Sequence, residues 1–257
     1  MGGHKIENYL QLLEVFIIRE LKSRYKASIL GFLWIILYPL ITAIILNFIF
    51  GQFIRINTSN IPYFLFVLSG LVIWNSFQQS INLSKDSLIW NRELIVKSSF
   101  PKDVLPLSYV LSKIPDFIIN LLILLFFCLL SGLELNITLL FIPFFMIPLF
   151  LFTAAISLLV SFTNAIFRDF GRITEFLLMI LFYITPVVYP ASFIPEKYRI
   201  IVLLNPLAVL IDSFRELLFH NKVQFEFFLP VILMSCFIFA FSLFLFKKFE
   251  NKIPDLI

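Results

Sequence analysis

The sequence predicts an all-α integral membrane protein that forms a single transmembrane domain over residues 1–257. Hydrophobic residues make up 60% of the chain and charged residues 14%, whereas soluble domains have about 45–50% and about 25%. Mean hydropathy is +0.98, and several apolar runs reach the roughly 20 residues that a helix needs to cross a hydrocarbon core. We therefore expect six transmembrane helices, an N-terminal interfacial amphipathic helix, and an external re-entrant helical hairpin before the last span.

Six apolar runs fit membrane-spanning helices: 30–50, 63–82, 107–131, 138–163, 172–190 and 225–246. Residues 200–219 are long enough for a seventh span. However, Asp212, Arg215 and Glu216 would be costly in lipid unless they were paired. The sequence therefore favours six spans over seven.

The distribution of basic residues predicts the orientation. With six crossings, and with Lys113 inside a span, one side of the membrane collects fourteen Lys and Arg residues and the other side five. The positive-inside rule then places both termini in the cytoplasm. Residues 191–222 become the external re-entrant segment, broken at Asn205–Pro206.

Residues 6–27 have the periodicity of an amphipathic helix on the inner membrane face. At 100° per residue, Arg19, Lys22 and Lys26 fall within about 60° of one another. The opposite side is apolar, with Ile17, Ile18, Leu21 and Tyr25. Arg24 projects to the edge of that apolar side, where two readings remain open. It either reaches a lipid phosphate or helps to hold an anionic, phosphate-bearing substrate that enters beside the first span.

The chain lacks the motifs of an enzyme. It contains no Gly-Lys pair and hence no phosphate-binding loop, so an ATP motor must be another polypeptide. The two histidines, His4 and His220, are expected on opposite sides of the membrane, and Cys128 and Cys236 lack chelating spacing. We expect no catalytic residue, no metal site and no cofactor in this chain.

Lys113 and Asp116 lie one helical turn apart inside the third span, which leaves two readings open. Ionisable groups inside a membrane are candidates for ion coupling, so the pair is compatible with an ion-coupled carrier. Alternatively, the two side chains form a local ion pair that makes insertion of the helix tolerable. The other spans offer no acidic residue near mid-membrane, which favours the ion pair.

The predicted cytoplasmic loop 83–106 contains a short amphipathic segment, 84–98, which ends near Pro101. Charged and apolar residues alternate within it, and its central residues are Trp90, Asn91, Arg92, Glu93 and Leu94. Such a helix could dock into a groove of a soluble partner. It could equally lie on the membrane.

Five stretches carry a resemblance to a known family: "RELKSRYKASILGFLWIILYPL", "NRELIVKSSFPKDVLPLS", "NAIFRDFGRITEFL", "TPVVYPASFIP" and "LNPLAVLIDSFRELLF". In order and spacing they resemble the permease subunits of type-2 ABC exporters that carry polysaccharides such as O-antigen, capsule and teichoic acid. The resemblance covers essentially the whole chain.

The resemblance implies a homodimer in the bacterial inner membrane, with two copies of a cytoplasmic ABC ATPase that would hold ATP and magnesium. It implies a substrate linked to undecaprenyl diphosphate, and no nucleic acid partner. Residues 6–27 would form the gate helix, and the substrate's diphosphate would pass Arg19, Lys22, Arg24 and the Leu30–Gly31 turn. Segment 84–98 would be the coupling helix, and 191–222 would lie at the external mouth.

Aromatic residues make up 18% of the chain, with 34 Phe, 8 Tyr and 3 Trp. Sugar rings stack on aromatic side chains, so rings that line a pore would let a glycan slide. Most Phe residues are expected to face lipid instead. The channel candidates are Trp34, Tyr38, Trp74, Tyr183 and Tyr189. An exporter of a drug or lipid remains an alternative to the glycan exporter, and the sequence does not identify the sugar.

Overall fold

The computed structural model describes residues 2–26, 31–58, 61–134 and 136–256. Within these ranges all regular structure is helical. Five helical segments are long and apolar enough to cross a membrane: Leu33–Phe53, Tyr63–Ser84, Val104–Leu130, Ile137–Ile166 and Phe225–Lys252. The predicted all-α membrane fold is confirmed, with five of the six predicted spans among these segments.

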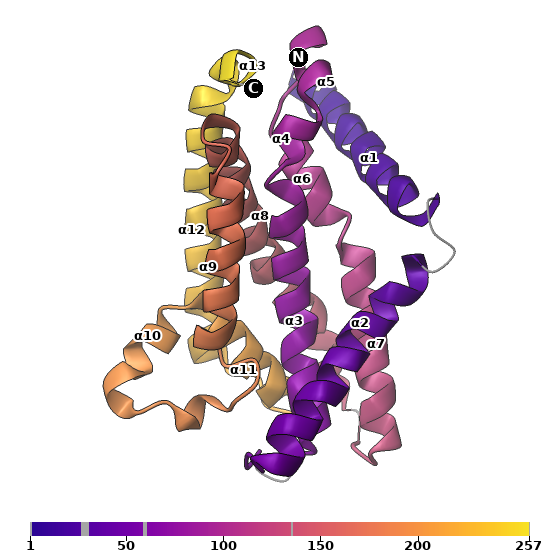
Figure 1. Cartoon of the computed structure of the whole chain (residues 1–257), viewed down its shortest axis with the longest axis vertical. Helices are drawn as coiled ribbons and strands as arrows, with labels where there is room; N and C mark the ends of the chain where they lie inside the picture. Colours follow the sequence, from indigo (N-terminus) through magenta and orange to yellow (C-terminus); the bar gives the residue numbers. More distant parts are fainter. Residues whose placement is uncertain (1, 27–30, 59–60, 135, 257) are drawn as a thin grey trace.

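The bundle is arranged around α3 (Figure 1). Its long helices are α1 (Gly2–Lys26), α2 (Gly31–Leu46), α3 (Tyr63–Ser84), α7 (Ile114–Leu130), α8 (Ile142–Ile166), α9 (Phe170–Ile184) and α12 (Phe225–Phe249). Helices α2 and α7 lie on one side of α3, and α8, α9 and α12 on the other. Helix α1 lies along α6 (Val104–Leu111) at the end of the bundle where both termini lie. We call this the near end and the opposite one the far end.

Three predicted spans are not single α-helices, and prolines interrupt two of them. Residues 107–131 divide into α6 and α7, since Pro115 occupies the first turn of α7. The segment 138–163 begins as a 3-10 helix (Ile137–Phe141), and α8 starts only with Pro143 in its first turn. The first span likewise changes form, from α2 into a π-helix (Asn47–Phe53).

The predicted helix 172–190 ends early. Helix α9 has 15 residues and is therefore roughly 22 Å long, shorter than the hydrocarbon core. Thr185 leaves the helix with φ −80° and ψ 134°, because Pro186 follows it and disfavours the α conformation. The prediction of a helix through residue 190 is wrong, and a crossing by this segment stays a prediction.

The segment 191–222 lies mostly at the far end (Figure 1). It contains two 3-10 turns (Ala191–Phe193 and Glu196–Tyr198), α10 (Arg199–Leu203) and α11 (Pro206–His220). The predicted break at Asn205–Pro206 is confirmed, and the Asn205 side chain accepts a hydrogen bond from the Leu207 N–H. Whether this hairpin re-enters a membrane stays a prediction.

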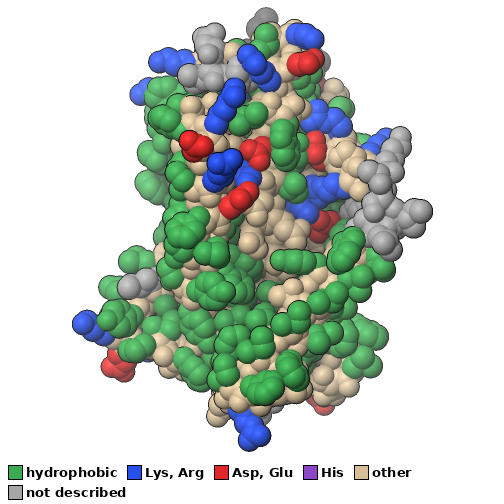
Figure 2. Space-filling model, in the orientation of Figure 1, with side chains coloured by type: hydrophobic (Ala, Val, Ile, Leu, Met, Phe, Trp, Pro, Cys, Tyr) green, Lys and Arg blue, Asp and Glu red, His purple; other side chains and the backbone are tan. Residues whose placement is uncertain are grey.

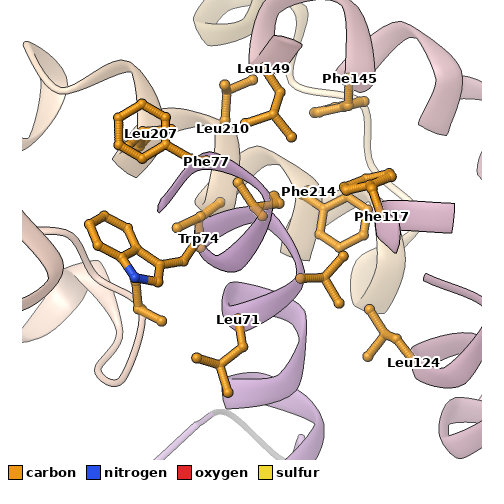
Figure 3. Close-up of a cluster of buried hydrophobic side chains, with 14 of the residues drawn as sticks. Leu71, Trp74, Phe77, Phe117, Leu124, Phe145, Leu149, Leu207, Leu210 and Phe214 are labelled. Carbon is orange, nitrogen blue, oxygen red and sulfur yellow. The ribbon is translucent and has the colours of Figure 1, made fainter. Parts of the chain in front are cut away.

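The main core forms where α3 meets α7, α8 and α11 (Figure 3). Phe77 stacks on Phe152 with ring centroids 5.7 Å apart. From α11, Leu207, Leu210 and Phe214 are almost fully buried. Because apolar burial is the main source of stability, α11 is part of the bundle rather than a loose surface hairpin.

A second core lies at the near end. It joins α1, α4 (Ser87–Trp90), α5 (Arg92–Lys97), α6, α8, α12 and α13 (Ile253–Leu256) through Phe16, Leu88, Ile95, Val104, Leu105, Leu158, Ala165, Phe246 and Ile253.

The segment 84–98, predicted as a single helix, contains two short helices, α4 and α5, that meet at Asn91. The chain leaves the helical conformation there, with φ −104° and ψ 23°.

Polar contacts also attach α1 at the near end. The Tyr9 hydroxyl donates to Asp103 Oδ2 at 3.0 Å, and Lys247 Nζ lies 3.4 Å from the same oxygen. Burial and the Asp103 carboxylate raise the pKa of Tyr9, so the phenol remains a donor. These bonds join α1, the start of α6 and the end of α12.

Candidate functional site

A charged cleft of about 380 Å³ lies between α1, α2, α3 and α7. Its lining residues are Arg24, Trp34, Ile35, Tyr38, Gln79, Lys113, Asp116 and Asn120. Charged side chains gather toward the near end on the face shown in Figure 2, and apolar side chains dominate below them.

Two cations converge on Asp116 in the charged cleft. Lys113 Nζ lies 2.7 Å from Asp116 Oδ2, which confirms the predicted pair one turn apart. Arg24 Nη1 lies 3.5 Å from the same oxygen, and Arg24 Nη2 donates to Ser112 Oγ. Lys113 also donates to Gln79 Oε1 at 2.9 Å. Two positive side chains and one carboxylate leave this cluster with a net positive charge.

Arg24 reaches the cleft because of its position on α1. Tyr9, Phe16, Glu20 and Arg24 follow one another at three- to four-residue multiples, so they share the face of α1 that packs on the protein. The sequence predicted that Arg24 contacts either a lipid phosphate or a substrate phosphate. It did not predict the contact with Asp116 that the structure shows.

Arg19 and Lys22, two other predicted entrance residues, are not among the described residues that line the charged cleft. Arg19 pairs with the adjacent Glu20 at 2.9 Å and lies over the Phe16 ring at 4.6 Å. Lys22 is exposed. Gly31 begins α2, and Leu30 lies outside the described residues.

A second cleft, of about 260 Å³, lies between α2, α3 and α9, and we call it the amide cleft. Its lining residues are Tyr38, Thr42, Leu46, Leu71, Trp74, Asn75, Gln78, Met179, Phe182 and Tyr183. Tyr38 lines both clefts. The Trp74 Nε1–H donates to Gln78 Oε1 at 3.0 Å, and its ring meets Phe182 edge-on at 5.3 Å.

Four of the five predicted channel aromatics line one or both clefts. Trp34 and Tyr38 line the charged cleft, and Tyr38, Trp74 and Tyr183 line the amide cleft. Tyr189 lines neither. Its hydroxyl donates to the carbonyl oxygens of Tyr183 at 2.8 Å and Ile184 at 3.1 Å, which caps the end of α9.

Sequence reasoning missed a stripe of amide side chains on α3. Asn75, Gln78, Gln79 and Asn82 recur at the three- and four-residue spacing of one helix face. The first three line the two clefts. The signal was present, because four amides at helical spacing are costly inside a membrane-spanning helix.

The predicted coupling residues present a mixed surface at the near end. Trp90 is 60% exposed, and Arg92 and Glu93 are exposed too. Leu94 and Asn91 are half-buried, and the Asn91 amide donates to the Ser87 carbonyl oxygen at 2.7 Å. Leu88 and Ile95 hold the two short helices in the near-end core.

Asn164, on α8, ties residues 85 and 86 at the start of segment 84–98 to α9. Its amide donates to the carbonyl oxygen of Lys85 at 3.1 Å and to Asp86 Oδ1 at 2.9 Å. Its own oxygen accepts the Gly171 N–H at 2.7 Å. Lys85 also forms an ion pair with Glu175 on α9. These contacts fix the end of α3 relative to the start of α9.

Arg215 is the most enclosed cation among the side chains that the structure describes, and it belongs to the fold rather than to a cleft. It is 4% exposed and lies 3.5 Å above the Phe66 ring. It donates to the carbonyl oxygens of Pro186, Val187 and Phe66 at 2.7, 2.6 and 3.0 Å, and to Ser69 Oγ at 3.3 Å. Those bonds fasten α11 to α3 and to the turn after α9.

Comparisons with known proteins agree over most of the chain. The family model described as ABC-2 type transporter matches residues 11–219. The O-antigen export system permease protein RfbA of Klebsiella pneumoniae is 35% identical over 96% of this chain and 95% of its own length. The protein of the same name from Myxococcus xanthus is 31% identical over 85% and 84%. The polysialic acid transport protein KpsM of Escherichia coli is 25% identical over 79% and 80%.

Proposed function

This chain belongs to the ABC-2 type transporter family, and on that premise we propose that it is the permease subunit of an ATP-driven polysaccharide exporter. Its substrate would be a glycan linked to undecaprenyl diphosphate. It would act as a homodimer in the bacterial inner membrane, with two copies of a separate ABC ATPase. The names of the relatives support export of a polysaccharide.

The observation that carries this proposal is the succession of the two clefts. The charged cleft contains two cations that share one carboxylate, and the amide cleft continues from it at Tyr38 with aromatic and amide side chains. A lipid-linked glycan has the same succession, with phosphates at the lipid and sugar rings beyond them. The site chemistry therefore follows the order of groups along the substrate.

The entrance would lie at α1, near the cytoplasmic side. Arg24 and Lys113 would attract the diphosphate, because an anion competes with Asp116 for the same donors. Arg19 and Lys22 would form the wet side of this helix toward lipid headgroups. In this orientation the near end faces the cytoplasm.

The remaining architecture follows from that orientation. Helix α9, together with the turn and bend at residues 185–190, would form the sixth crossing, and α10 with α11 would form the re-entrant hairpin at the external mouth. Trp34, Tyr38, Trp74, Tyr183 and Tyr189 would contact the passing sugar rings.

The ATPase would dock on the exposed surface of α4 and α5. Trp90, Arg92 and Glu93 present both apolar and charged groups there, and Asn164 with the Lys85–Glu175 pair would transmit the movement to α9. Simultaneous charge reversal, Arg92→Glu with Glu93→Arg, should abolish co-purification of the ATPase, whereas Lys252→Ala should not. Unchanged co-purification would contradict this docking surface.

Deletion of the gene in its source bacterium tests the function. The proposal expects loss of the surface polysaccharide and accumulation of lipid-linked glycan inside the cell. An ion-coupled carrier built on Lys113 and Asp116 would instead respond to a proton gradient and need no ATPase. Normal surface polysaccharide in the deletion strain would refute the exporter proposal.

A further inference from the structure

The amide cleft lies near the middle of α3, the most buried of the five candidate spans. Asn75 is the thirteenth of the 22 residues of α3, so it sits about halfway along a membrane-spanning segment. It is 4% exposed and lines the cleft. A polar side chain at this depth costs free energy unless it serves a partner.

Among the three amides of the stripe that line a cleft, hydrogen bonding distinguishes Asn75 from Gln78 and Gln79. Gln78 accepts from Trp74, and Gln79 accepts from Lys113. Asn75 Nδ2 is buried and has no hydrogen-bond acceptor among the described residues. Amides in membrane helices usually bond across to another helix. Asn75 Nδ2 makes no such bond within the described ranges, so a ligand in the cleft would supply the acceptor that it lacks.

The rest of the cleft has the chemistry of a sugar site. Tyr38 is 49% exposed and Tyr183 64% exposed, and they come from two different helices, α2 and α9. Trp74 lies deeper, beside Asn75 on α3. Aromatic rings accommodate the apolar C–H face of a pyranose, and the amide groups of Asn75 and Gln78 can exchange hydrogen bonds with its hydroxyls.

Charge narrows the class of sugar. The residues that line the amide cleft are all uncharged, whereas Arg24 and Lys113 line the charged cleft. A sugar carboxylate would lose its water in the amide cleft without gaining a cation, which is unfavourable. An uncharged sugar ring loses much less hydration free energy when it enters the cleft.

We propose that the amide cleft is a subsite for an uncharged sugar ring of the transported glycan, with Asn75 as the residue that selects for its hydroxyls. The identity of the sugar as part of a transported glycan rests on the proposed function. The subsite itself is a binding property of this chain and is measurable without an ATPase.

Trp74 provides a probe at the site. The chain has three tryptophans, so Trp34→Phe with Trp90→Phe leaves Trp74 as the sole indole emitter. This variant is placed in lipid nanodiscs, where no sugar detergent competes, and titrated with maltotriose or with a linear trimer of sialic acid. We expect a saturable change in Trp74 emission with maltotriose and none with the acidic trimer.

Asn75→Leu in this background should raise the half-saturating concentration of maltotriose about tenfold, because one hydrogen-bonding side chain is lost. Asn75→Ser, a smaller change, should raise it less and serves if the leucine variant does not fold. Asn82→Leu removes an amide of the same stripe that lines neither cleft, and binding should be unchanged. Monodispersity and the emission maximum without sugar report folding.

Three results would overturn the subsite. One is no saturable response to maltotriose in the parent, and another is equal weakening by Asn75→Leu and Asn82→Leu. The third is Trp74 emission that responds to neither sugar but changes when dimers dissociate on dilution. That result would mean that a second copy of the chain occupies the cleft. If sugar binds while the deletion strain keeps its surface polysaccharide, the exporter proposal fails and the subsite stands.

Discussion

Two arginines in this chain show two ways to keep a cation inside a membrane protein. Arg215 is 4% exposed, and its donors are directed at three carbonyl oxygens and one hydroxyl. The Arg24 side chain is 21% exposed, and it shares Asp116 with Lys113. A cation with neutral, fixed acceptors holds the fold together. A cation that shares a carboxylate beside a cleft can exchange that partner for an anionic ligand.

The largest effect is expected at Arg215. Arg215→Met keeps much of the side-chain volume but leaves the carbonyl oxygens of Pro186 and Val187 without this donor, whereas that of Phe66 still accepts from Ser69 Oγ. Each unsatisfied buried group costs about 1–3 kcal/mol, so the variant should lose most of its monodisperse protein in detergent. Size-exclusion profiles and thermal unfolding measure this. A variant as stable as the parent would show that Arg215 does not hold the fold together, and the contrast with Arg24 would fail.

Gly70→Ala should destabilise the same contact from the opposite side. An added Cβ would lie 2.7 Å from Arg215 Nη2 and 3.0 Å from the Val187 carbonyl oxygen. Overpacking of this kind costs about 1–3 kcal/mol. Thermal unfolding should show a smaller loss than in Arg215→Met, and the effects of the two changes should not add. Full additivity would mean that Gly70 matters for another reason.

Arg24→Ala should reverse the pattern, with little change in stability and a clear loss of export. A partly exposed ion pair contributes about 1 kcal/mol or less, whereas loss of a phosphate-binding cation should lower surface polysaccharide about tenfold. Arg168→Ala is the control, because Arg168 is exposed and lines neither cleft. Immunoblots of surface glycan at matched expression provide the measurement. Equal export by both variants would remove the role of Arg24.

Asp116→Asn should have the smallest effect. The amide oxygen still accepts from Lys113, and the two cations remain to attract an anion, so ATP-dependent export should fall only about threefold, less than in Arg24→Ala. An ion-coupled carrier would lose transport altogether, since its titratable group is gone. Export assays with and without the ATPase separate these outcomes.

Local patterns predicted much of this fold and less of the site. Apolar runs and basic loops are local signals, so five of the six predicted spans and the common end of the two termini could be predicted. The end of α9 was predicted too late in the chain, because the prediction followed the apolar run through Pro186. A proline disfavours the helical conformation at the residue before it. The spacing of the amide stripe that begins at Asn75 could be read from the sequence. Its relation to a cleft could not, because the cleft is formed by helices from distant parts of the chain.

The partners of single side chains could not be predicted, because they come from distant parts of the sequence. Arg24 and Asp116 are 92 positions apart, and Tyr9 and Asp103 are 94 apart. No periodicity within one helix contains that information. Lys113 and Asp116 could be paired correctly because they lie one turn apart on the same helix.

The bonds of Arg215 also have a consequence for biogenesis. Ser69 and Arg215 are separated by 146 positions, and ribosomes add about 5–20 residues per second. For roughly 7–30 seconds of synthesis, α3 is therefore in the nascent chain before the arginine that joins it to α11 has been made. A chain that stops before residue 215 retains the α3 sequence without this closing contact. Synthesis of α11 thus decides whether the helices made before it become a finished bundle.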